Sequence, residues 1–72
     1  MLETIRSLIL ARCPELEAED ITEEADLYLD LELSDRDLLR CVAALEDMTG
    51  LTADREALED LHTVGQLAAL FE

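Results

Sequence analysis

Apolar residues return every three or four positions in three stretches of the chain, which is the spacing of one buried face on an α-helix. The first predicted helix covers residues 2–12 and ends near Cys13, because Pro14 cannot continue it. Its predicted core positions are Leu2, Ile5, Leu8 and Ile9. The polar positions that we expect to point away from the core are Glu3, Arg6 and Ser7.

The second predicted helix covers residues 35–49 and stops at Gly50, and a shorter piece is expected over residues 53–60. A last helix follows Thr63, which caps it while Gln66 closes a capping box. The core face of the second helix is predicted to be Leu38, Cys41, Val42, Leu45 and Met48. Its opposite stripe holds Arg36, Arg40, Ala43 and Asp47. The core face of the last helix is predicted to be Val64, Leu67, Ala68 and Phe71.

Residues 15–33 carry alternating leucines instead of a helical pattern. Since a lone strand would have no partner, we expect a long loop folded over the bundle. The leucines expected to anchor it are Leu27, Leu29, Leu31 and Leu33. The predicted fold is therefore all-α, a single domain over residues 1–72 built as a small bundle of three longer helices and one short helix.

The size and the charge of the chain argue against several classes of function. A chain of 72 residues hides only about 60% of its unfolded surface, which leaves no room for an enclosed pocket of roughly 300 Å³, so we predict that the protein is not an enzyme. The formal net charge of −14 argues against nucleic acid and anionic membrane surfaces as partners. No apolar run approaches the ~18 residues of a spanning helix, and no secretory signal is seen. We expect a cytoplasmic protein.

The acidic residues concentrate in residues 15–32, which carry no basic residue. This segment is either a loop kept soluble by its charge or a surface that steers a basic partner. Cys13 and Cys41 show no metal-ligand spacing and are read as free thiols. His62 has no second histidine to share a metal, so no metal site is predicted.

The stretch "LELSDRDLL" marks the start of the second helix. Ser34 is followed three residues later by Asp37 and then by an apolar run, which predicts an N-cap worth about 1 kcal/mol relative to alanine. Asp35, in the first turn, adds a favourable interaction with the positive end of the helix.

From Glu19 onward, "EDITEEADLYLDLELSDRDLLRCVAALEDMTGL" followed by "LHTVGQLAAL" resembles the acyl carrier proteins. These are small acidic bundles that bear a 4'-phosphopantetheine arm in fatty-acid, polyketide and peptide assembly. The motifs "EDIT", "ALEDMTGL" and "TVGQLAAL" occur in the order of the family. The resemblance implies a non-catalytic carrier with 4'-phosphopantetheine as its cofactor. It also implies a monomer whose partners are acyl-transfer or ligase-type enzymes with basic docking surfaces.

The resemblance also locates a departure. Family members typically read Asp-Ser-Leu where this chain has Ser34, Asp35 and Arg36, so the attachment position falls on Asp35. Its carboxylate is not a normal acceptor for the arm. Ser34 is the displaced candidate for attachment of the arm, and it lies about 100° around the helix from Asp35. Arg36 and Arg40, together with Asp47, are the implied partner-binding residues, and the two arginines would disfavour the housekeeping fatty-acid enzymes.

Two functions remain open on the sequence. One is a specialised carrier modified at Ser34. The other is an interaction or regulatory module of the same fold that holds no arm, since Asp35 replaces the usual serine.

Overall fold

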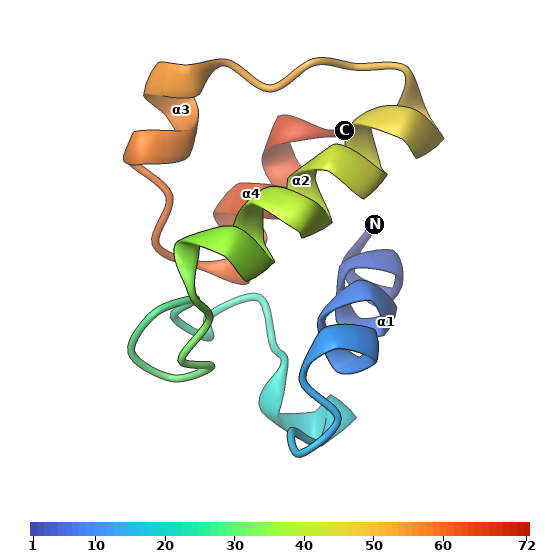
Figure 1. Cartoon of the computed structure of the whole chain (residues 1–72). Helices are drawn as coiled ribbons and strands as arrows, with labels where there is room; N and C mark the ends of the chain where they lie inside the picture. Colours follow the sequence, from blue (N-terminus) through green and yellow to red (C-terminus); the bar gives the residue numbers. More distant parts are fainter.

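The structure is a computed structural model that describes residues 1–72, and it confirms the predicted all-α bundle. Helix α1 spans Leu2–Arg12, α2 spans Asp35–Thr49, α3 spans Arg55–Glu59 and α4 spans Val64–Leu70. A single turn of 3-10 helix, Ala18–Asp20, interrupts the long loop and was not predicted. Figure 1 shows α2 crossing the molecule diagonally, with α4 behind it and α1 beside it. No helix has the length and apolar character needed to cross a membrane.

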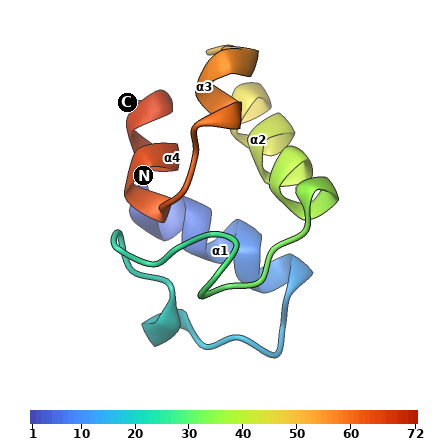
Figure 2. The same ribbon diagram turned by 90° about the vertical axis from the view of Figure 1, so that its left-hand side faces the viewer.

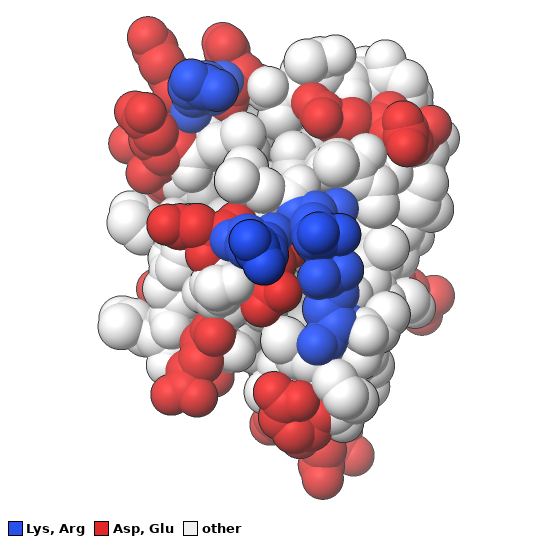
Figure 3. Space-filling view, viewed as in Figure 1, with Lys and Arg blue, Asp and Glu red and all other residues white.

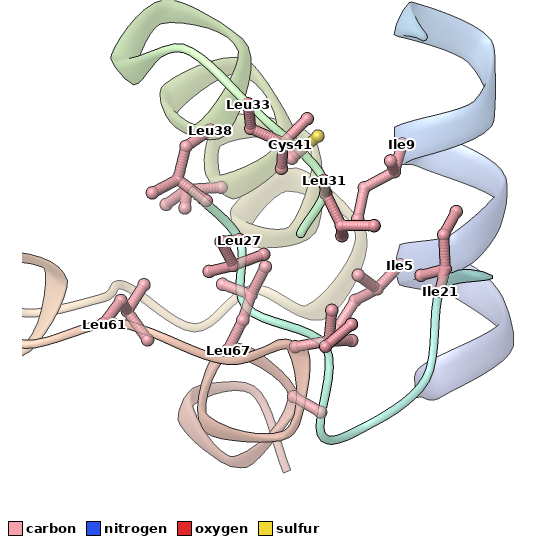
Figure 4. Close-up of a cluster of buried hydrophobic side chains, with 14 of the residues drawn as sticks. Ile5, Ile9, Ile21, Leu27, Leu31, Leu33, Leu38, Cys41, Leu61 and Leu67 are labelled. Carbon is pink, nitrogen blue, oxygen red and sulfur yellow. The ribbon is translucent and has the colours of Figure 1, made fainter. Parts of the chain in front are cut away.

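Helix α1 packs against both α2 and α4, and the long loop passes beneath the ends of α1 and α2 (Figure 2). The core between them consists of apolar side chains alone, with no buried polar or charged residue. Its fully buried large members include Ile5, Ile9, Ile21, Leu27, Leu45, Val64 and Leu67 (Figure 4). The loop therefore contributes to the core as the helices do, through Ile21 and Leu27.

The predicted ends of α1 and α2 and the predicted start of α4 are confirmed, whereas α3 (Arg55–Glu59) is shorter than the predicted piece over residues 53–60. Cys13 follows α1 directly, before Pro14. Gly50 ends α2 in the left-handed conformation (φ 75°), which glycine adopts without a side-chain clash, and its N–H donates to the carbonyl of Glu46. Thr63 and Gln66 form the predicted capping box of α4.

The long loop is fixed to the start of α4 by backbone hydrogen bonds. The N–H of Leu27 donates to the carbonyl of His62 (2.7 Å), and the N–H of Gly65 donates to the carbonyl of Glu23 (2.8 Å). A Cβ atom at Gly65 would lie 3.0 Å from that carbonyl oxygen, so glycine permits the close approach. The acidic segment is thus an ordered part of the fold.

Three predicted side-chain orientations are wrong. Leu29 is 82% exposed because it lies in a tight turn, where its N–H donates to the carboxylate of Asp26. Met48 is 63% exposed because the buried stripe of α2 continues from Leu45 through half-buried Thr49 instead. Met48 and Thr49 point in directions about 100° apart around the helix axis.

Arg6 is the third wrong orientation. Its guanidinium does not point away but donates two hydrogen bonds to the carbonyl of Ile21, at 3.2 and 3.0 Å from Nε and Nη2. The buried position of Ile21 beside α1 brings this carbonyl within reach of the long arginine side chain.

Candidate functional site at the start of helix α2

The first turn of α2 holds the residues that the sequence singles out. Ser34 is the N-cap in an extended conformation (φ −80°, ψ 162°), and its Oγ accepts a hydrogen bond from the N–H of Asp37 at 3.2 Å. This confirms the predicted cap. Asp35 is the first helical residue, and both Ser34 and Asp35 are exposed. The hydroxyl and the carboxylate are therefore both accessible at the positive end of the longest helix.

Buried leucines hold this turn in place. Leu33 and Leu38, on either side of the exposed residues, are both in the core. The N–H of Leu33 also donates to the carbonyl of Leu27 (3.0 Å). Glu32, directly before Leu33, has a left-handed φ of 54°, which is uncommon for a residue with a side chain. Leu31 and Leu33, on either side of this bend, are both buried in the core.

An ion pair fixes the start of α2 to the end of α1. Nε of Arg12 lies 3.2 Å from Oδ1 of Asp37. The hydrogen bond from Arg12, followed by that from the Ser34 hydroxyl, lowers the pKa of Asp37 below the ordinary value for aspartate. These contacts therefore favour the ionised form of the Asp37 carboxyl.

An open groove of about 530 Å³ lies beside Asp35, between α2 and α3. Both apolar and charged side chains line this groove: Tyr28, Asp35, Leu38, Leu39, Arg55, Leu58 and Glu59. Partial burial, and then the carboxylates of Asp35 and Asp26, raise the pKa of Tyr28. The tyrosine therefore stays a neutral phenol at neutral pH.

The remaining site residues lie along the outer side of α2. Arg36, Arg40 and Asp47 are all exposed, as the helical spacing predicts. Figure 3 shows basic side chains gathered over α2 and α1 in the middle of this face, with acidic side chains around them. The sequence did not indicate Arg12, because a separation of 25 positions from Asp37 gives no periodic signal.

Acidic side chains of the long loop accept hydrogen bonds from its own backbone. The carboxylate of Asp26 accepts the N–H groups of Tyr28 and Leu29, both at 2.8 Å, and that of Asp30 accepts the N–H of Asp26. The two N–H donors lower the pKa of Asp26. The structure holds no group of three or more histidine, cysteine, aspartate or glutamate side chains arranged to bind a metal ion.

The sequence profile of the family described as "Phosphopantetheine attachment site" matches residues 3–71, nearly the whole chain and including the turn at Ser34. The chain belongs to this phosphopantetheine-attachment family. It is also 44% identical, over 62 residues, to the acyl carrier protein of Saccharopolyspora erythraea. The match covers 86% of this chain and 65% of that relative, so the chain spans less than two thirds of the relative's length. Members of the acyl carrier family are non-catalytic carriers of 4'-phosphopantetheine, which is the cofactor that the family membership implies here.

The residues at the start of α2 differ in how they fit this cofactor. The arm is joined through a phosphodiester to a hydroxyl oxygen, and the carboxylate of Asp35 offers no such group. Ser34 does fit: its hydroxyl is exposed, and the free N–H groups of the first turn favour an anion such as a phosphodiester. The exposed hydroxyl of this turn therefore belongs to Ser34 and not to Asp35, the residue that the sequence predicts at the attachment position.

Proposed function

We propose that this protein is a specialised, non-catalytic carrier of acyl or aminoacyl groups, with its 4'-phosphopantetheine arm on Ser34. The arm supplies a thiol that holds the cargo as a thioester. The observation that carries the proposal is the exposed Ser34 hydroxyl at the N-terminus of α2, in a chain whose family is defined by arm attachment. The protein's own residues hold the attachment turn in place through Leu33, Leu38 and the Arg12–Asp37 pair.

The proposed partners are acyl-transfer or ligase-type enzymes. The acidic segment 15–32 is ordered against the bundle and would face basic surfaces on these enzymes. Arg36 and Arg40 would disfavour the housekeeping fatty-acid enzymes, which points to a dedicated pathway of the cytoplasm. A monomeric carrier fits this role.

A second candidate function rests on the carboxylate of Asp35, the residue that the sequence predicts at the family's attachment position. In this alternative the protein holds no arm and acts as an interaction or regulatory module on the same partner enzymes. The capping hydrogen bond of Ser34 would then be its whole role.

Intact-mass measurement separates the two functions. The purified protein is incubated with coenzyme A and a broad-specificity phosphopantetheinyl transferase, beside Ser34→Ala and Asp35→Ser. The carrier proposal expects one arm on the wild type and none on Ser34→Ala. An arm on Asp35→Ser alone would contradict it and establish the second function. A wild-type arm that persists in Ser34→Ala would contradict both, because it would sit on another residue.

A further inference from the structure

The two cysteines of the chain lie in one part of the core, where the end of α1 meets the first half of α2. Cys13 directly follows α1, and its N–H donates to the carbonyl of Ile9 (2.8 Å), which continues the last turn of that helix. Cys41 lies on the buried side of α2. Both are free thiols, and the exposed fractions are 8% for Cys13 and 2% for Cys41. Neither thiol takes part in the proposed carrier function.

The Arg12–Asp37 ion pair fixes where the end of α1 lies along α2. Nε of Arg12 is 3.2 Å from Oδ1 of Asp37. Cys13 is the residue after Arg12, and Cys41 follows Asp37 by four positions, which is one helical turn on the same side of α2. The ion pair therefore brings Cys13 and Cys41 within about one helical turn of each other along the contact between the two helices.

The thiol of Cys41 is directed toward α1. In Figure 4 its sulfur atom points from α2 toward Ile9, the residue one turn before Cys13. Burial raises the pKa of Cys41, and negative charge on Asp37 and on Cys13 raises it further. Since charges shift a pKa mainly at close range, the effect of Cys13 agrees with two thiols that are neighbours in the core.

We propose that Cys13 and Cys41 form a reversible disulfide that joins the end of α1 to α2, with a low-molecular-weight disulfide such as oxidised glutathione as the oxidant. The new bond closes beside the Arg12–Asp37 pair and makes this contact between the helices covalent. The chain thereby has a thiol–disulfide redox site. This site goes beyond the proposed function and does not depend on the arm.

The reaction is two successive thiol–disulfide exchanges. Cys13 attacks first, because it is the more exposed thiol and attack requires access. It gives up its proton and bonds to one sulfur of the small disulfide, whose S–S bond breaks, and the other half leaves as a thiolate that takes up a proton. Cys41 then gives up its proton and attacks the Cys13 sulfur, which releases the second small thiolate to be protonated in turn. Two protein thiols are oxidised to one disulfide, and the small disulfide is reduced to two thiols.

The surroundings of the two thiols set the pace of this reaction. Burial raises the pKa of both Cys13 and Cys41, and the carboxylate of Asp37 raises it further. Because the thiolate is the nucleophile, exchange is slow at neutral pH. The site therefore responds to sustained oxidation, and its test is an equilibrium measurement.

The wild-type chain is equilibrated with reduced and oxidised glutathione at several ratios, both folded and in about 8 M urea. The reaction is stopped with acid, and intact mass is measured before and after alkylation of the remaining thiols. With two cysteines in the chain, an intramolecular disulfide has only one pairing. We expect a monomer that has lost two hydrogens and takes up no alkyl group. The ratio of disulfide to dithiol should be at least about tenfold higher in the folded chain than in urea, since the fold holds the two sulfur atoms together.

Two single variants are the matched controls. Cys41→Ala should take up one glutathione on Cys13 as a mixed disulfide, and Cys13→Ala should react at least about tenfold more slowly, because Cys41 is less accessible. Neither variant can lose two hydrogens as a monomer. A measurement on the wild type is independent of the variants: the oxidised chain should unfold at a higher urea concentration than the reduced chain, because the disulfide is favoured in the folded state.

Three results would overturn the proposal. These are mixed disulfides with glutathione alone, disulfide-linked dimers alone, or a disulfide that is no more favoured in the folded chain than in urea. The mass experiment on Ser34 is carried out with a reducing agent present, so failure of the redox site and failure of the carrier function are distinguishable.

Discussion

Helices α2 and α4 both begin at a residue with a hydroxyl side chain, but the two starts are built differently. In α4, Oγ1 of Thr63 accepts the N–H of Gln66 (3.2 Å), and Oε1 of Gln66 accepts the N–H groups of Thr63 and His62 (3.1 and 2.7 Å). The long loop covers this turn, with Ala25 accepting the N–H of Val64. Every backbone N–H group from Thr63 to Gln66 is therefore bonded within the fold.

In α2 the residue at the position of Gln66 is Asp37, and its side chain makes a different contact. Ser34 accepts the N–H of Asp37, but the Asp37 carboxylate forms its ion pair with Arg12 of α1 and closes no capping box with the N–H of Ser34. Ser34, Asp35 and Arg36 remain exposed. The same capping chemistry thus produces one closed, structural helix start and one that presents a hydroxyl, a carboxylate and a guanidinium to solvent.

This difference separates stability from chemistry along the chain. Substitutions around α4 should act on folding, whereas substitutions on the outer side of α2 should act on binding and modification while folding changes little. Stability measurements on paired variants test this separation directly.

The largest effect is expected from truncating one leucine in each region. Leu67 of α4 is fully buried, so Leu67→Ala should lower the free energy of unfolding by about 2–5 kcal/mol. Leu39 of α2 is 57% exposed, so Leu39→Ala should change it by less than about 0.5 kcal/mol. Urea denaturation followed by circular dichroism measures both. Similar losses in the two variants would show that the outer side of α2 also carries the fold.

Most of the fold was predictable because helical periodicity and helix-end residues act over a few positions. Pro14, Gly50 and the Thr63–Gln66 box set helix ends that the structure confirms. Leu29 and Met48 were predicted wrongly for local reasons. A carboxylate-capped turn rotates Leu29 outward, and the buried stripe of α2 drifts past Met48 to Thr49.

The site was predictable in its residues but not in its contacts. The spacing of Ser34 and Asp37 predicts the cap, and the helical stripe predicts that Arg36 and Arg40 are exposed. The partner of Asp37 depends on how α1 packs against α2, because Arg12 comes from a different helix. Contacts of this kind, and the groove between α2 and α3, arise from tertiary packing and have no periodic signal.

The next largest change in unfolding free energy is expected from removing the capping hydroxyl of Thr63 or of Ser34. Thr63→Ala should cost about 1–2 kcal/mol of unfolding free energy, because Gln66 also loses its reciprocal arrangement beneath the loop. Ser34→Ala should cost about 0.5–1 kcal/mol, since its cap is single and exposed. Thr63→Ser keeps the hydroxyl and serves as the control, with a change under about 0.5 kcal/mol. A larger loss in Ser34→Ala would contradict the separation, since α2 would then depend more on its cap than α4 does.

The smallest effect concerns the exposed Arg12–Asp37 pair and appears as a pH dependence. The pKa of Asp37 is lower in the folded chain than the roughly 3.9 of an unfolded aspartate, so its stabilising contribution is present above that value and is lost as the pH falls through the folded pKa. In Arg12→Gln the pKa of Asp37 should rise toward the unfolded value, as NMR titration of its carboxyl carbon measures. The unfolding free energy of wild type minus that of Arg12→Gln should therefore shrink on acidification, and taking this difference cancels the titration of the other carboxylates. At about 1 M salt this difference in unfolding free energy should shrink at neutral pH too, because the pair is exposed to solvent.

The contradicting outcome is a pKa of Asp37 that is unchanged in Arg12→Gln. It would show that the Ser34 hydroxyl, and not the contact with α1, holds this carboxylate ionised.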